Sequence, residues 1–308
     1  ELLSACLSGK TADQLHQSGI DYKESQIALL KIMRLLREKD NTLKTMIPVF
    51  GPGKTESLRM TAGKAANTLY PAIKKDVIGL VRHLKTRGRE RNTYTILFSF
   101  ILDGLVWDEL EKREMIDSMK ITAEKPFWDG EVWAVYPKRT FSCGTNTSTI
   151  PGLSLSLNWS PSAPDLIWSF WGNRETRMQM LRDVSDNGRI DDKNLIQTFA
   201  GYNLCDEQGN ITIPVIETQP DNSLFSMCRN IAETTAASIS SELELAEITK
   251  WFGLRDNKQT VIIVYHEVIW ELLQKFEQDN VIEKPAAFAN PSSAEKSDVS
   301  DLLFFCCG

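Results

Sequence analysis

The stretch Trp107-Asp108-Glu109-Leu110 recurs later in the chain as Trp270-Glu271-Leu272-Leu273. Three further stretches recur around it in the same order. These are Ile47-Pro48-Val49 with Ile213-Pro214-Val215, Glu124-Lys125-Pro126 with Glu283-Lys284-Pro285, and Phe141-Ser142-Cys143-Gly144 with Phe305-Cys306-Cys307-Gly308. Self-similarity of this kind indicates an internal repeat and comes before any motif in deciding a fold.

The spacing of the recurring stretches supports a tandem duplication. Pro48 and Trp107 are 59 residues apart, and Pro214 and Trp270 are 56 residues apart. We therefore predict two repeats, residues 1–144 and 145–308, packed about a pseudo-twofold axis. A chain of 308 residues is long enough for two domains with cores of their own.

Composition favours a soluble globular protein, with 42% hydrophobic and 25% charged residues. The longest apolar stretch, Tyr94 to Trp107, is interrupted by Asp103 and is too short to span a bilayer, so we expect no membrane association. The six cysteines form no C-x-x-C motif and no Cys/His cluster, which predicts no metal site. Reduced, buried thiols of this kind are typical of a cytoplasmic protein.

Charge is unevenly distributed along the chain. Residues 1–92 contain 17 Lys and Arg against 9 Asp and Glu, a local charge of +8, whereas the whole chain carries −6. A basic segment indicates an anionic partner, or else a face that complements the acidic remainder of the protein. The basic residues from Lys74 to Arg91 fit either a phosphate contact or an ordinary solvated helix face.

The first fifty residues predict two short helices, a longer helix and a strand. Thr11 is placed to cap a helix over Ala12–Gln17, and Gly19 to end it. Asp21, with Glu24 three residues later, predicts the start of a third helix that runs from about Tyr22 to Arg37. Asp40-Asn41 then forms a turn before a strand from Leu43 to Phe50.

This order of elements resembles the winged-helix family, a class of helix-turn-helix domain. The resemblance covers Glu1–Phe50 and implies that the third helix enters the DNA major groove while the following strands form the wing. It also implies a set of DNA-binding residues: Lys23, Ser25, Gln26, Lys31, Arg34, Arg37 and Lys44. One departure is that the predicted third helix is apolar on much of its circumference, which suits a helix buried on two sides.

Longer helices and small β elements are expected to complete both repeats. We predict helices over Leu58–Leu84, with Pro71 kinking or dividing it, and over Thr93–Met119, Leu224–Phe252 and Gln259–Gln278. Short strands are expected at Val132–Tyr136 and Thr140–Cys143, around an Asp129-Gly130 turn, and at Leu153–Leu157 and Asp301–Cys307. The predicted fold class is α+β and helix-rich.

Two motif fragments lack residues that their chemistry requires. Gly51-Pro52-Gly53-Lys54-Thr55 is similar to part of a phosphate-binding loop, but Pro48 stands where the pattern needs a glycine. His266-Glu267 begins like a zinc-protease helix, but Trp270 replaces the second histidine. These departures favour a protein without a cofactor.

Asp103 and His266 each stand four residues before one of the repeated tryptophans. On a helix this spacing puts the polar residue on the same face as the tryptophan. The bland interpretation is a polar residue that is hydrogen-bonded within an apolar face. The sharper hypothesis is an inter-repeat polar contact between Asp103 and His266, sensitive to pH or ligand.

These features together lead to three functional predictions. The first is a DNA-binding transcription regulator that contacts double-stranded DNA through the basic first repeat. The second is a protein-binding adaptor or scaffold that uses winged-helix-like repeats for a protein partner or for self-association. The third is an enzyme of an unrecognised kind, which the absence of a recognisable catalytic motif makes the weakest.

Overall fold

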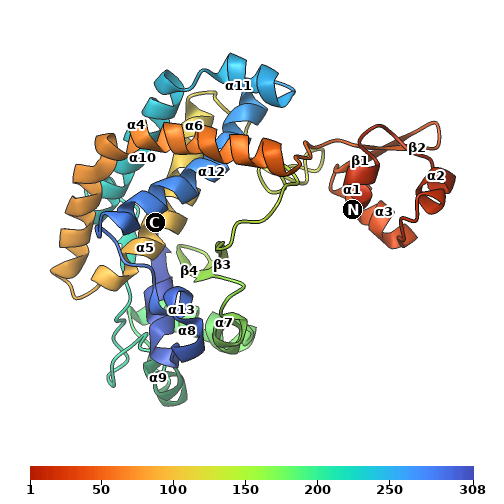
Figure 1. The fold of residues 1–308 in the computed structure, drawn as a ribbon. Helices are drawn as coiled ribbons and strands as arrows, with labels where there is room; N and C mark the ends of the chain where they lie inside the picture. The colour runs from red at the N-terminus through yellow and green to blue at the C-terminus, as the bar shows by residue number, and fades with distance from the viewer. The chain divides into compact units, whose positions relative to one another are not determined.

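The computed structural model describes residues 1–308, apart from the side chain of residue 242. Helices dominate, and the strands form one two-stranded and one four-stranded sheet, which confirms the predicted α+β, helix-rich class (Figure 1). The chain divides into two compact units. Unit 1 comprises Glu1–Lys64, Leu110–Lys138 and Leu243–Val268, and unit 2 comprises Ala65–Glu109, Arg139–Glu242 and Ile269–Gly308.

This division differs from the predicted boundary at Gly144, because both units include segments from either side of that residue. Segments of the two units therefore alternate along the chain, and two long helices belong to both units. α4 (Pro52–Lys85) and α12 (Asn257–Gln278) each begin in unit 1 and end in unit 2. The predicted duplication of sequence remains a prediction.

Unit 1 opens with a small module of three helices and a hairpin, coloured red in Figure 1. Its elements are α1 (Leu2–Ala5), α2 (Ala12–Gln17), α3 (Glu24–Ile32), β1 (Leu36–Lys39) and β2 (Thr42–Thr45). A buried cluster holds them together: Cys6, Leu15, Ile27, Leu36 and Leu43. Every element from α1 to β2 contributes to this cluster or packs against it, so the module has a core of its own.

The predicted start of α2 is confirmed. The Thr11 hydroxyl accepts a bond from the Gln14 N–H, and the Gln14 side chain accepts one from the Thr11 N–H, which forms a capping box. The predicted cap of α3 at Asp21 is wrong. The residue before α3 is Lys23, whose N–H donates to Gln26 Oε1 at 2.7 Å.

The predicted helix over Tyr22–Arg37 and strand over Leu43–Phe50 are both corrected by the hairpin. α3 ends at Ile32, and Arg34 adopts a left-handed conformation with φ of 57°. Asp40 and Asn41 also have positive φ, the requirement of a type I′ turn between antiparallel strands. The chain forms this hairpin instead of a longer helix because strand geometry brings the Leu36 side chain into the core.

The remainder of unit 1 includes the start of α4, the end of α6 (Val106–Lys112), α11 (Leu245–Phe252) and the start of α12. The strand predicted at Val132–Tyr136 is reduced to a single bridge between Val135 and Val49, so this prediction is wrong. The helix predicted over Leu224–Phe252 is interrupted by a break between α10 (Ser223–Glu242) and α11.

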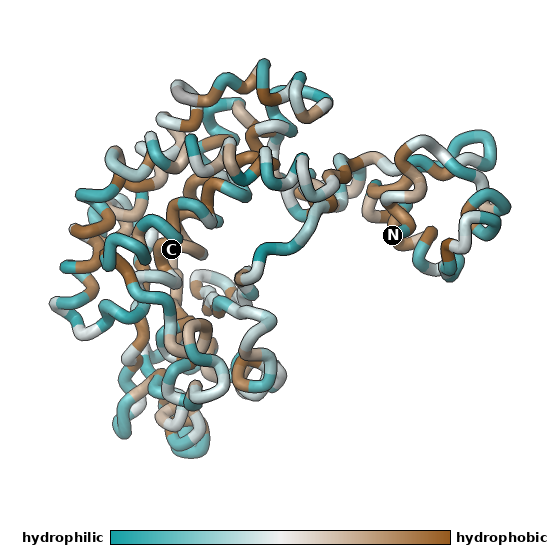
Figure 2. The backbone as a smooth tube through the Cα atoms, in the orientation of Figure 1, coloured by the Kyte–Doolittle hydropathy of each residue, from teal (hydrophilic) through white to brown (hydrophobic). Residues whose placement is uncertain are grey.

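α4 is one continuous 34-residue helix. Its buried residues recur every three or four positions, among them Leu58, Ala62, Leu69, Ile73 and Leu84. Hydrophilic and hydrophobic positions accordingly alternate along its length in Figure 2. This is the pattern of an amphipathic helix with one face in the core.

Unit 2 contains the four-stranded sheet, in the order β3-β4-β6-β5. The strands are β3 (Gly144–Ile150), β4 (Leu153–Trp159), β5 (Val215–Glu217) and β6 (Leu303–Cys307). β5 runs parallel to β6, and the other pairs are antiparallel. β4 and β6 match predicted strands, whereas Thr140–Cys143 is irregular and the strand forms just after it.

The helices of unit 2 surround this sheet. Besides α10 and parts of α4, α6 and α12 they are η1 (Glu90–Asn92), α5 (Thr93–Thr95), η2 (Ile96–Leu105), α7 (Pro164–Trp171), α8 (Arg174–Asn187), α9 (Lys193–Ala200), α13 (Ala286–Ala289), η3 (Pro291–Ser293) and η4 (Lys296–Leu302). α10 packs against η2, and α8 packs against β3 and β4.

η2 is a π-helix, where the sequence predicts ordinary α-helix over Thr93–Met119. The Val106 N–H reaches back five residues to the Ile101 carbonyl. A Cβ at Gly104 would lie 3.1 Å from the Ser99 carbonyl oxygen, so glycine relieves crowding inside the widened turn. Apolar periodicity cannot distinguish the two helix types over ten residues.

Candidate nucleic-acid interface

The seven residues that the winged-helix resemblance selects are all exposed and all belong to the N-terminal module. Lys23 precedes α3, and Ser25 and Gln26 lie in its first turn. Lys31 lies in its last turn, Arg34 follows the helix, and Arg37 and Lys44 lie on the hairpin. The two arginines are therefore outside the helix that was predicted to carry them.

Arg34 lines a cavity of about 830 Å³ in unit 1. Met33, Met46 and Phe127 line the same cavity, together with the carboxylates of Asp117 and Asp129. The left-handed backbone conformation of Arg34 directs the chain away from α3 and into the hairpin. Lys120, Lys125 and Arg255 also line the cavity, so Arg34 has apolar neighbours and charged neighbours of both signs.

The hairpin concentrates positive charge on one face. Arg37 and Lys44 are directly opposite each other in the register of β1 and β2, and both are exposed. Lys39 is two residues beyond Arg37 on the same face, opposite Thr42. Like charges directly opposite one another destabilise a sheet, so this arrangement favours an anion that neutralises them.

Lys39 and Thr42 were missed by the sequence prediction. They were missed because the sequence reading continued the third helix to Arg37 and began the strand after the turn. The Asp40-Asn41 turn was itself visible. Pairing the residues on its two sides would have placed Lys39 beside Arg37. Among the residues the structure describes, Arg37, Lys39 and Lys44 form no ion pair.

The polar residues of α3 are partly engaged within the module. Lys31 Nζ lies 2.6 Å from Glu38 Oε2, and both side chains are 42% exposed. Gln26 accepts the Lys23 N–H and so caps the helix. Ser25 lies between these capping residues and faces solvent.

Two large apolar side chains are also exposed on α3. Leu29 is 55% exposed and Ile32 is 62% exposed. This differs from the prediction that the third helix would be buried on two sides, because Leu35 and Leu36 leave the helix and enter the core. An exposed apolar pair at three-residue spacing forms a short stripe on one helix face.

Asp103 and His266 each have a partner in their own unit. Trp107 Nε1 donates to Asp103 Oδ1 at 3.3 Å in unit 2, and burial raises the pKa of this carboxyl to about 6. In unit 1, His266 Nδ1 lies 2.7 Å from the Ile262 carbonyl oxygen, and its ring stacks on Trp133 at 3.5 Å. Burial lowers the pKa of His266 to about 4. A contact between Asp103 and His266 stays a prediction.

The two repeated tryptophans have different neighbours within unit 2. Trp107 is buried and bonded to Asp103, as above. Trp270 stacks on Phe98 at 5.4 Å and meets Phe141 edge to face. Asp103 and His266 are both hydrogen-bonded, as the bland interpretation expects, but Asp103 bonds to its tryptophan whereas His266 bonds to a backbone carbonyl.

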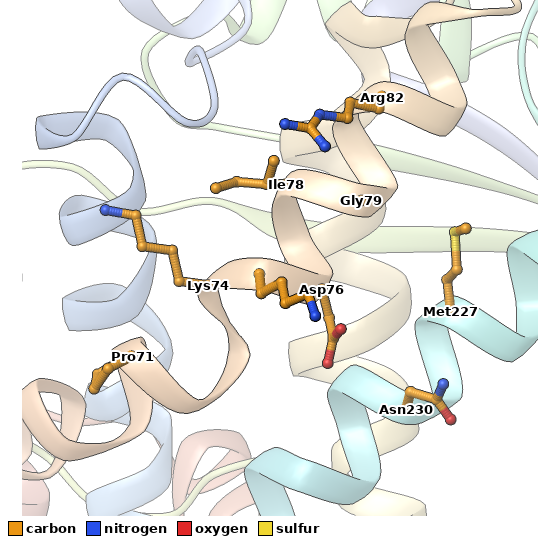
Figure 3. A pocket seen from close by; sticks show the side chains of 9 residues that line it. Pro71, Lys74, Asp76, Ile78, Gly79, Arg82, Met227 and Asn230 are labelled. Carbon is orange, nitrogen blue, oxygen red and sulfur yellow. The ribbon is translucent and has the colours of Figure 1, made fainter.

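Most of the local positive charge lies outside the module. Residues 1–50 hold 7 basic and 6 acidic residues, a net +1, whereas residues 51–92 hold 10 and 3, a net +7. In unit 2 part of this second set lines a pocket of about 580 Å³, where Figure 3 shows Lys74 and Arg82 on α4 and Met227 and Asn230 on α10. Lys74 Nζ lies 2.6 Å from Asp279 Oδ2, so this lysine already has an anionic partner in the protein.

The glycine-rich stretch at Gly51 begins α4 and forms no phosphate loop. Thr55 is buried and its hydroxyl donates to the Gly51 carbonyl at 3.0 Å. Lys54 Nζ donates to the Phe252 carbonyl at 3.3 Å. Both polar groups that a nucleotide would require have partners in the protein.

Comparisons with protein-family models, with curated proteins and with solved structures gave no match to this chain. Across the described residues, no helix has the length and apolarity that crossing a membrane requires. The described His, Cys, Asp and Glu side chains include no group of three or more placed to hold a metal ion.

Proposed function

We propose that the N-terminal module binds double-stranded DNA in a regulatory role, with α3 and the β1–β2 hairpin as the contact surface. The observation that carries the proposal is the opposed pair Arg37 and Lys44, with Lys39 beside them, on one exposed face of the hairpin. Three cations on a flat exposed face suit the regularly spaced phosphates of a duplex.

The arrangement of elements supports the same surface. A hairpin directly follows the third helix, and Lys10 bridges Leu43 on β2 in antiparallel fashion. In winged-helix proteins the third helix reads base edges while the hairpin meets the backbone. On this chain Ser25 and Gln26 would be nearest the bases, and Arg37, Lys39 and Lys44 would contact phosphates.

The test measures the affinity of the full chain for random duplex DNA at several salt concentrations. We expect a linear fall of log affinity with log salt, because each neutralised phosphate releases a counterion. Changing Arg37→Ala and Lys44→Ala together should weaken binding about tenfold or more at low salt and reduce the slope by roughly two. Lys64→Ala, an exposed lysine on α4, is the matched control.

Affinity that does not respond to salt, or that is equal for the hairpin variant and the Lys64→Ala control, would overturn the DNA proposal. Thermal unfolding of each variant should be measured first. All three side chains are exposed, so the variants are expected to fold like the parent.

A second candidate function, protein binding or self-association, is favoured by the exposed pair Leu29 and Ile32. Apolar residues on an outward helix face suit a groove or a second copy of the same helix. Sedimentation velocity over a hundredfold range of protein concentration distinguishes self-association. The adaptor function predicts a larger species that Leu29→Gln with Ile32→Gln removes, while the hairpin variant retains it.

A further inference from the structure

A small cavity lies in unit 2, where the end of α4 meets the start of α10. Its volume is about 100 Å³, and the polar residues lining it are His83, Arg87, Arg89, Asn222 and Ser223. That volume corresponds to roughly three water molecules in the liquid. A single tetrahedral oxyanion therefore fits.

The walls of the cavity carry positive charge without a carboxylate among the lining residues. Burial lowers the pKa of the half-buried Arg89 guanidinium, and the nearby positive charge of Arg87 lowers it further. Burial, followed by Arg87, also lowers the pKa of His83. Crowded cations in a partly desolvated place cost free energy until an anion joins them.

The two arginines keep donors available beyond their bonds to the protein. One Arg89 nitrogen donates to the Ile211 carbonyl at 3.1 Å, and one Arg87 nitrogen lies 3.3 Å from the His83 carbonyl oxygen. A guanidinium has five N–H donors, so both retain groups that can meet an oxyanion. Their planar forks match the oxygen spacing of phosphate.

The start of α10 adds a favourable field. This helix has 20 residues, and its first-turn N–H groups carry the positive end of its dipole. Asn222 Oδ1 accepts the Phe225 N–H at 3.0 Å, and Asn222 Nδ2 lies 3.1 Å from Glu217 Oε2. Glu217 therefore adjoins the rim, where it is outnumbered by the two guanidiniums.

We propose that this cavity is a binding site for a phosphate dianion, either free phosphate or the terminal phosphate of a small monoester, recognised by Arg87, Arg89 and the start of α10. A phosphodiester is disfavoured by charge, since it carries one negative charge where the dianion carries two, and it offers the guanidiniums fewer unsubstituted oxygens. This site belongs to unit 2 and is independent of the DNA-binding proposal.

The first test is calorimetric titration of the full chain at pH 7.5 and constant ionic strength. The probes are inorganic phosphate, methyl phosphate and dimethyl phosphate. We expect saturable binding of the first two and at least tenfold weaker binding of the diester. Tighter binding of methyl phosphate identifies a monoester as the natural source, and tighter binding of inorganic phosphate identifies the free ion. No saturable binding, or equal binding of the diester, would overturn the proposal.

The second test changes the cavity wall. Arg87 is exposed, so Arg87→Gln should fold normally, and loss of its charge-assisted bonds should weaken phosphate binding about tenfold or more. Lys75→Gln is the matched control, because Lys75, on α4, is another exposed cation and does not line this cavity. Equal affinity of the parent and Arg87→Gln contradicts the assignment.

Histidine resonances give a readout without calorimetry, because the chain has only 3 histidines. A dianion beside the His83 ring favours its protonated form, so saturating phosphate should raise the pKa of His83. His16 and His266, which do not line the cavity, are internal controls. A pKa of His83 that phosphate leaves unchanged would place the anion elsewhere.

Discussion

The N-terminal module and unit 2 differ in the burial of their charged side chains. In the module the charged side chains from Glu1 to Lys44 are exposed, apart from the half-buried Lys10. In unit 2 Arg177 and Asp301 are buried, at 6% and 5% exposure, and Asp103 is half-buried. The charges in the first region face solvent, whereas these three groups in unit 2 are packed inside the folded structure.

This difference predicts which substitutions should change binding and which should change the stability of the fold. Exposed charges contribute little to folding because water and salt screen them. Buried charges have lost their hydration, so the fold must supply bonds to each of them. Substitutions in the module should therefore change binding, and substitutions in unit 2 should change stability and its pH dependence.

The largest expected effect is on Arg177. Its guanidinium donates to Ser148 Oγ at 2.9 Å and to the Trp171 carbonyl, and it lies 4.1 Å from the centroid of the Trp171 ring. Arg177→Ala would leave these groups without a partner and should lower the free energy of unfolding by about 3 kcal/mol. Urea denaturation measures it.

The matched substitution in the module is Arg37→Ala, for which we expect a change below about 0.5 kcal/mol. Similar losses for both variants would break the comparison, since an exposed and a buried arginine would then contribute alike.

The next effect is a pH dependence that comes from Asp103. Burial raises the pKa of Asp103 in the folded protein from its ordinary value of 3.8 to about 6, so the folded state holds this proton more tightly than the unfolded state. Ionisation of Asp103 therefore lowers the free energy of unfolding. This loss of stability is complete above pH 6 and absent well below pH 4. Asp103→Asn should raise the free energy of unfolding by about 1 to 2 kcal/mol at pH 7.5.

The same substitution should have almost no effect at pH 4, which makes the parent-minus-variant difference the quantity to measure by urea denaturation. His266, whose depressed pKa acts with the opposite sign below pH 6.5, is present in both proteins and cancels in the difference. A gain of equal size at both pH values would show that packing, and not the charge of Asp103, is responsible.

The smallest expected effect is the change in DNA affinity when the charge of Glu38 in the module is removed. Glu38 Oε2 lies 2.6 Å from Lys31 Nζ, on the face of the hairpin opposite Arg37 and Lys39, and partly neutralises that lysine. Glu38→Gln should strengthen duplex binding about two- to threefold at low salt, because it removes repulsion and releases the lysine. Fluorescence anisotropy at two salt concentrations measures it, and weaker binding would mean that Glu38 positions Lys31.

Sequence reasoning succeeded where a signal is local. The Thr11 cap of α2 and the alternation over Leu153–Leu157 were each visible in a few residues, and each is present.

Sequence reasoning failed where distant residues decide. The end of α3 depends on whether Leu36 gains more by continuing a helix or by entering the core from a strand, and helix periodicity continues through this region. In the candidate site it identified exposed residues but attached Arg34 and Arg37 to the wrong element. The cavity beside α10 joins residues more than a hundred positions apart, a relation that no local pattern contains.

By itself the sequence determined the helix-rich class, the Thr11 cap of α2 and the concentration of basic residues before Asn92, because these follow from the composition and short-range geometry of the chain. Only the tertiary structure decided that Arg37 opposes Lys44, that Asp103 loses its hydration, and that the two units interleave. The physical reason is that burial and strand pairing are settled by competition among all segments for one core, and this competition includes residues far apart in the chain.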